Sequence, residues 1–260
     1  MFAVIGGTVL DALGPVVALA TDDGAGDEVF CSGVVVGPAH VLTAGHCARY
    51  AEELVAAGAV ASVLWGSEVR GWAAVDVHPE ASDLDHDHDL AVITLDDDAP
   101  TAPAALASGP PAVGDEVTLY GFGASSEGGT DAGTLRGTHL EVLEVDERVF
   151  LSFAPGTNVC SGDSGGPAVA TVEDGWWVVG IDTFVDPTCL GGTAGSTRVD
   201  VHLDWLADVV GELVLEPIGP PAVRPMEKGC NMAQAPLGIW GVLGLLGAVS
   251  RRRAAAAPQA

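Results

Sequence analysis

Residues 160–168 read CSGDSGGPA. Two interpretations of this run of small residues are open. Gly, Ser and Asp favour turns, so the stretch could be an ordinary surface turn. Alternatively, glycines without side chains let backbone N–H groups surround a reacting oxygen beside a serine nucleophile. The rest of the chain distinguishes the two interpretations.

The composition predicts an all-β protein. Of 260 residues, 48% are hydrophobic, 35 are Gly and 16 are Pro, which suits a sizeable core with many turns. Short apolar runs separated by turn residues predict strands at 16–20, 32–37, 91–95, 116–123, 139–145 and 176–184. Helical spacing predicts helices at 48–58 and 199–215, the second with an apolar face of Val201, Trp205, Val209 and Leu213.

The charge is strongly negative. The 36 acidic residues exceed the 10 basic ones, so the formal net charge is −26. A chain that binds nucleic acid through phosphates needs a basic surface, so we exclude nucleic acid as a partner.

Two further motifs lie upstream of the opening stretch. TAGHC at 43–47 follows an apolar strand, and DHDLAVITL at 87–95 places an acid directly before one. With GDSGGP at 162–167 they supply His46, Asp89 and Ser164, in that order. Each residue alone has a structural explanation. Together they are what covalent hydrolysis needs, which is a hydroxyl nucleophile, a base and an acid that orients the base.

Residues 4–213 resemble the trypsin/chymotrypsin-like serine proteases, the S1 peptidase family. GDSGGP matches that family's nucleophile motif, and TAGHC resembles its TAAHC box with Gly45 in place of alanine. VIGG at 4–7 resembles the N-terminus that these enzymes acquire on activation, and YGFG at 120–123 resembles their GWG segment. The resemblance implies two packed six-stranded antiparallel β-barrels with a C-terminal helix, and an active site in the cleft between the barrels.

The resemblance also implies a role for each site residue. Ser164 is the expected nucleophile, His46 the general base and acid, and Asp89 the group that orients the imidazole. The backbone N–H groups of Gly162 and Ser164 would form the oxyanion hole. The carboxylate of Asp163 would pair with a new α-amino group at Val4, so cleavage after Ala3 would activate a zymogen.

The five cysteines are widely spaced along the chain, at Cys31, Cys47, Cys160, Cys189 and Cys230. Four suit two disulfides and one stands apart, which indicates an exported protein. The resemblance implies that Cys31 pairs with Cys47 beside the histidine, and that Cys160 pairs with Cys189 around the specificity pocket.

The resemblance implies that Asn158 forms the base of that pocket, with Thr183, Phe184 and Val185 on its wall. Asn158 carries no charge and Val185 narrows the space, so we expect a preference for small or medium uncharged side chains.

Residues 83–89, DLDHDHD, alternate acids with imidazoles. They could form a metal site, because His and Asp bind zinc or calcium. On an alternating strand, His86 and His88 would share one face. We favour a solvated acidic loop that leads to Asp89, and we expect neither a metal nor a cofactor.

The C-terminal residues differ in character. Residues 216–236 contain five prolines and predict a linker that includes Cys230. The apolar run at 237–250, followed by Arg251, Arg252 and Arg253, predicts a short transmembrane segment in residues 237–260, with a packed helix as the alternative. The pattern GCNMAQAP, apolar run and RRR resembles the MYXO-CTERM sorting signal. It implies processing at Cys230 and display at the cell surface or outer membrane, or release from the cell.

The N-terminal residues contain no export signal. Only Met1, Phe2 and Ala3 precede Val4, so either the start codon was assigned too far downstream or the chain is a fragment, and we favour the first.

We therefore expect residues 4–215 to form a serine endopeptidase domain with protein or peptide substrates and with protease inhibitors as further partners. Two other functions stay open. One is a non-catalytic protease homologue that binds a partner through the cleft, and the other is an adhesive surface protein.

Overall fold

The structure is a computed structural model that describes residues 4–11, 14–82, 86–172, 175–186 and 188–216. All of these lie in one compact unit, residues 1–219. The expected linker, membrane segment and sorting tail, with Cys230, lie outside the described residues. Within the described residues, no helix has the length and apolar character needed to cross a membrane.

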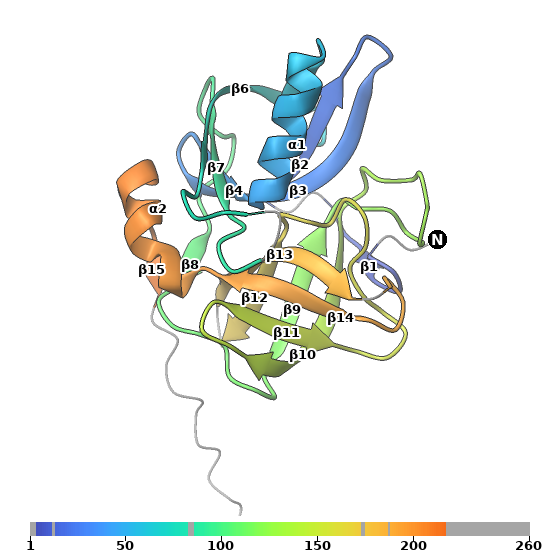
Figure 1. The fold of residues 1–260 in the computed structure, drawn as a ribbon, viewed down its shortest axis with the longest axis vertical. Coiled ribbons are helices and arrows are strands. Elements are labelled where there is room, and N and C mark those ends of the chain that lie inside the picture. The colour runs from blue at the N-terminus through green and yellow to red at the C-terminus, as the bar shows by residue number, and fades with distance from the viewer. Residues whose placement is uncertain (1–3, 12–13, 83–85, 173–174, 187, 217–260) are drawn as a thin grey trace, which may run out of the picture. The chain divides into compact units, whose positions relative to one another are not determined.

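The first barrel closes in the strand order β2-β3-β4-β7-β6-β5 and occupies the upper half of Figure 1. Every neighbouring pair in it is antiparallel. Its strands are β2 (Val16–Asp22), β3 (Asp27–Gly37), β4 (His40–Thr43), β5 (Val60–Trp65), β6 (Glu68–Val77) and β7 (Ala91–Leu95). Buried Val, Leu and Ile side chains such as Leu42 and Ile93 fill it.

The second barrel closes in the order β12-β9-β10-β11-β14-β13, because β12 also pairs with β13. Its strands are β9 (Glu116–Gly121), β10 (Arg136–Val145), β11 (Val149–Phe153), β12 (Pro167–Val172), β13 (Gly175–Asp186) and β14 (Thr193–Arg198). Three short strands join its sheet, namely β1 (Thr8–Val9), β8 (Ala105–Ala107) and β15 (Leu215–Glu216). Two six-stranded antiparallel barrels are what the sequence predicted.

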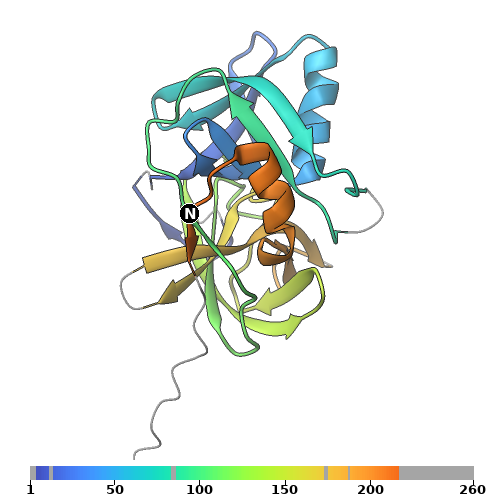
Figure 2. The same cartoon turned by 90° about the vertical axis from the view of Figure 1, so that its left-hand side faces the viewer.

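The helices differ in extent from the prediction. Helix α1 (Gly45–Ala56) begins three residues earlier than expected and includes His46 and Cys47. The C-terminal segment forms a 3-10 turn, η1 (Asp200–His202), and then the short helix α2 (Leu203–Val210), which ends before Gly211. Figure 2 shows α2 in front of the two barrels.

The apolar face predicted for the C-terminal helix is correct only in part. Trp205, Val209 and Leu213 pack against the first barrel's core, and Leu206 is completely buried there. Val201 was expected on the same face but is 45% exposed. The difference arises because Val201 lies in η1, where the rotation per residue differs from that of an α-helix.

Ser32 of β3 joins the two barrels. Its hydroxyl donates to the carbonyl oxygen of Gly162 at 2.8 Å and accepts from the N–H of Phe122 at 2.9 Å. Its own N–H donates to the carbonyl oxygen of Ser164 at 2.8 Å. Ser32 is completely buried, so water cannot replace these bonds. One first-barrel residue therefore fixes the loop that carries residues 162–164.

We expect Ser32→Ala to lower the free energy of unfolding by about 1–3 kcal/mol, because it leaves the Phe122 N–H without its acceptor in a buried environment. Ser152→Ala is the matched control. Ser152 is equally buried, and its hydroxyl has no hydrogen-bond partner among the described residues. Urea unfolding of both variants measures the difference, and equal losses would contradict a role for the Ser32 bonds.

Candidate active site

His46 and Asp89 meet at the edge of the first barrel. His46 lies in the first turn of α1, and Asp89 lies two residues before β7 begins. Nδ1 of His46 is 2.6 Å from Oδ2 of Asp89, and the backbone N–H of His46 donates to Oδ1 at 2.7 Å. The Asp89 side chain is 2% exposed and that of His46 37%. A buried carboxylate thus fixes an imidazole whose side chain is partly exposed.

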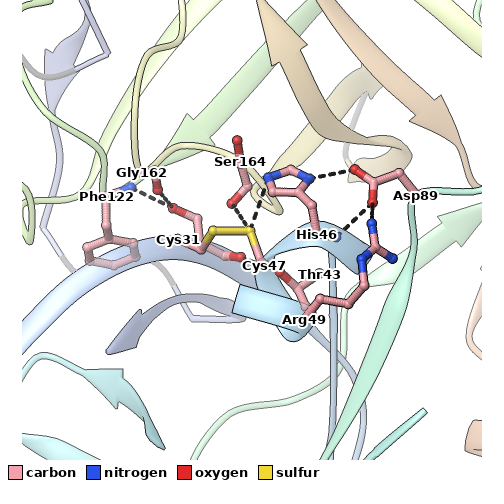
Figure 3. Close-up of a disulfide and its surroundings, with 10 residues drawn as sticks. Cys31, Thr43, His46, Cys47, Arg49, Asp89, Phe122, Gly162 and Ser164 are labelled. Carbon is pink, nitrogen blue, oxygen red and sulfur yellow. Dashed lines mark hydrogen bonds and ion pairs between the residues drawn. A yellow bond between two sulfur atoms is a disulfide. The ribbon is translucent and has the colours of Figure 1, made fainter. Parts of the chain in front are cut away.

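Arg49 approaches the same carboxylate from the next turn of α1. Its Nη2 is 3.7 Å from Oδ1 of Asp89, as Figure 3 shows. A Cβ on Gly45 would lie 3.0 Å from Oδ1 of Asp89 and 3.3 Å from Nη1 of Arg49. The glycine at this position therefore leaves room for the guanidinium beside the acid.

Ser164 belongs to a tight loop that precedes β12. Gly162 and Gly165, on either side of it, have φ values of +93° and +83°, which residues with side chains rarely adopt. A Cβ on Gly165 would lie 2.3 Å from the carbonyl oxygen of Ser32, so only glycine fits there. The backbone of Ser164 is thus placed directly against the first barrel.

The Cys31–Cys47 disulfide lies next to both the imidazole of His46 and the loop that carries Ser164. The sulfur of Cys47 is 3.5 Å from Nε2 of His46 and 3.6 Å from the carbonyl oxygen of Ser164. Figure 3 shows the disulfide below the two residues. The structure therefore brings His46, Asp89 and Ser164 to one place, between the two barrels.

Both disulfides implied by the resemblance are present. Cys31 and Cys47 join β3 to α1 with their Cα atoms 6.2 Å apart, and Cys160 and Cys189 are joined with Cα atoms 5.0 Å apart. The predicted pairing is confirmed.

Asp163 points away from the solvent. It is completely buried, and its carboxyl oxygens accept the N–H groups of Gly123 and Cys160, both at 2.8 Å. Burial raises the pKa of Asp163 to about 7, and the two N–H donors only partly oppose the effect. Arg136 also lowers this pKa, as the smallest contribution, and within the described residues no basic side chain forms an ion pair with the carboxylate.

The N-terminal segment packs against the second barrel. Val4 is completely buried, and the carbonyl oxygen of Ile5 accepts the N–H of Asn158 at 2.9 Å and the hydroxyl of Thr157 at 2.6 Å. Val4 has a φ of +43°, which is unfavourable for a β-branched residue. The segment is thus held in a strained conformation.

A cavity of about 180 Å³ opens beside Ser164. Of the predicted pocket residues, Phe184 and Val185 line it, together with Cys160 and Cys189. The side-chain amide of Asn158 forms hydrogen bonds within the protein. Its Nδ2 donates to the carbonyl oxygen of Gly192 and its Oδ1 accepts the N–H of Val159, both at 2.9 Å. The Thr183 hydroxyl donates to the carbonyl oxygen of Gly195 at 3.2 Å.

Sequence reasoning missed three residues of this region, Ser32, Arg49 and Asp182. Asp182 lines the cavity and is 3% exposed. An acid in the apolar run WWVVGIDTF was a usable signal, because a charged residue rarely occupies a strand that is otherwise buried. Ser32 and Arg49 gave no such signal.

Comparisons with known proteins agree with this geometry. A family model described as Trypsin matches residues 11–206. A trypsin from Saccharopolyspora erythraea is 29% identical over 214 residues, with 75% of this chain and 91% of the relative covered. Trypsin-1 of Astacus astacus is 28% identical over 206 residues, covering 68% of this chain and 86% of the relative.

The fold matches that of a solved serine protease. Mouse neuropsin superposes with a TM-score of 0.66, covering 79% of this chain and 99% of that chain at 24% sequence identity. Because the family model covers most of the chain, the chain belongs to the trypsin family of serine proteases.

Proposed function

We propose that this chain is a serine endopeptidase that cleaves peptide bonds through an acyl-enzyme on Ser164. The observation that carries the proposal is the 2.6 Å hydrogen bond between His46 and the buried Asp89, in a chain of the trypsin family. Protein and peptide substrates, and inhibitors that occupy the same cleft, are the partners that this chemistry implies.

The proposed chemistry begins with the tautomer of His46. Because Asp89 accepts the hydrogen on Nδ1, the lone pair is on Nε2. Nε2 takes the proton of the Ser164 hydroxyl while Oγ attacks the substrate carbonyl carbon, and Asp89 stabilises the imidazolium. The imidazolium then protonates the leaving amine as the C–N bond breaks. Water repeats the sequence on the acyl-enzyme and frees Ser164.

Backbone orientation supports an oxyanion hole at Gly162 and Ser164. The carbonyl oxygen of Ser161 accepts the N–H of Ala124 at 2.8 Å, and that of Asp163 accepts the N–H of Gly166 at 2.9 Å. In a trans peptide the N–H points opposite to the C=O. The N–H groups of Gly162 and Ser164 are therefore held away from these internal bonds, where each would stabilise a developing oxyanion.

Activation by cleavage between Ala3 and Val4 is supported by charge and by strain. Asp163 is buried and forms no ion pair within the described residues, and a new α-amino group at Val4 would supply one beyond the weak effect of Arg136. The same cleavage removes the carbonyl group that defines φ of Val4, and so relieves the unfavourable value of +43°. Two separate costs of the uncleaved chain thus disappear in one step.

We also infer export and display at the cell surface through the C-terminal residues, including Cys230. Two disulfides in the folded part support an oxidising compartment.

A fluorophosphonate probe tests the proposed nucleophile. We expect the protein that begins at Val4 to react with the probe and Ser164→Ala to lose all labelling, because Oγ is the atom that bonds to phosphorus. Ser161→Ala, three residues away in the same loop, is the matched control and should still be labelled. A folded Val4 form without labelling would instead favour the non-catalytic homologue that binds a partner.

Activation is tested by the length of the N-terminus. We expect the Val4 form to exceed the chain that begins at Met1 in kcat/KM by at least about 100-fold, since the oxyanion hole depends on the loop that Asp163 anchors. A form with one extra alanine before Val4 should behave like the uncleaved chain. Equal activity of all three forms would rule out the salt bridge as the switch.

A further inference from the structure

Three histidines from distant parts of the sequence meet beside a second cavity, which shares no lining residue with the cavity beside Ser164. His78 directly follows β6, His88 precedes β7 and His202 ends η1. One ligand atom of each lies within 4.8 Å of the others. They line a cavity of about 360 Å³ together with Glu80, Glu147 and Arg148. We call His78, His88 and His202 the histidine cluster.

This arrangement replaces the one expected from DLDHDHD. Residues 86–88 form a turn and no strand, so the condition under which His86 and His88 would share a face is not met. The ring of His86 stacks on Phe184 with centroids 4.3 Å apart, whereas His88 stacks on His78 at 4.8 Å. The turn separates the two imidazoles, and His88 finds its partners outside the motif.

The spacing of His88 and His202 suits a shared metal ion. Nδ1 of His88 is 3.1 Å from Nε2 of His202. Two nitrogens that are each about 2.0–2.1 Å from a tetrahedral zinc ion lie about 3.3–3.4 Å apart. A shift of a few tenths of an ångström would therefore place one ion between them.

Both rings have outer partners that orient them for this role. Nδ1 of His202 is 2.8 Å from the carbonyl oxygen of Arg198, so Nδ1 carries the hydrogen and Nε2 offers its lone pair. Nε2 of His88 is 3.3 Å from a carboxylate oxygen of Glu80. When an ion binds Nδ1 of His88, the proton moves to Nε2 and is donated to Glu80. Carbonyl and carboxylate partners of this kind hold metal-ligating histidines in place.

His78 completes the set after a rotation of its ring. Its Nδ1 accepts the N–H of Glu80 at 3.2 Å, and its stack on His88 would have to open for a nitrogen to face the ion. The charged groups other than histidine that line the cavity are Glu80, Glu147 and Arg148, so their sum is negative. The positive charge of Arg148 also acts on His78 and His202, but Arg148 is paired with Glu147 at 3.8 Å.

We propose that the histidine cluster binds one zinc ion, or another divalent transition metal that takes imidazole ligands, with Glu80 as the outer partner of His88. The site borders the candidate active site, because His88 is the residue directly before Asp89. The N–H of Leu90 donates to the carbonyl oxygen of His88 at 2.7 Å, and the N–H of His78 donates to that of Leu90 at 2.9 Å. A bound ion would therefore hold the segment that carries Asp89 against the segments of His78 and His202.

The test measures zinc binding directly on the full chain without an affinity tag. We expect isothermal titration to show one equivalent of Zn²⁺, and Co²⁺ to give the visible absorption of a four-coordinate site. At a free zinc concentration 100-fold above Kd, Tm should rise by about 5–10 °C over the value in EDTA. A Tm that is unchanged by zinc would overturn the proposal.

Variants assign the binding to these side chains. His88→Gln and His78→Gln should each remove most of the zinc-dependent rise in Tm, and His202→Gln should do the same if the buried residue tolerates the change. His139→Gln is the matched control, since the His139 side chain is 68% exposed and pairs with Glu116 elsewhere on the surface. Undiminished zinc binding in both His78→Gln and His88→Gln would place the ion elsewhere.

Discussion

The hydrogen bonds of Ser32 hold together a site whose parts belong to different barrels. His46 and Asp89 come from the first barrel and Ser164 from the second, so their mutual position is only as accurate as the packing between the barrels. Ser32 lies in a strand of the first barrel and binds the carbonyl oxygens on both sides of Asp163. Because it is buried, these bonds do not exchange with water. The rest of the loop, with its two left-handed glycines, is built around this attachment.

Buried acids surround this loop, and each is satisfied to a different degree. Asp89 has the imidazole and backbone of His46, with Arg49 nearby. Within the described residues, Asp163 has two N–H donors but no ion pair, and Asp182 has a carboxyl oxygen without a hydrogen bond. A folded chain tolerates such groups where a later event supplies the partner. The missing partners therefore explain why acidic residues are placed within otherwise apolar segments near the candidate active site.

Much of this architecture could be predicted from the sequence, because a family motif indicates where a residue lies in the fold as well as which reaction it supports. GDSGGP and TAGHC predicted the family, both barrels and both disulfides correctly. Motifs could not predict contacts between segments that are distant in sequence. The histidine cluster combines residues 78, 88 and 202. Neither the spacing of these histidines in the sequence nor the residues beside them indicates that they meet. Val201 was misplaced for a local reason, since a 3-10 turn changes the rotation on which the helical pattern depends.

The disulfide between Cys31 and Cys47 has a consequence for acid–base chemistry. Its sulfur lies 3.5 Å from Nε2 of His46, and a bridged sulfur has no hydrogen to donate. A free thiol at the same place would offer one and compete with the serine hydroxyl for the same lone pair. Oxidation of this pair thus leaves the imidazole free to accept the proton of the Ser164 hydroxyl in the proposed mechanism. The bond that joins a strand to a helix thus also keeps a competing hydrogen donor away from the neighbouring ring, so the redox state of the surroundings becomes a condition of the chemistry itself.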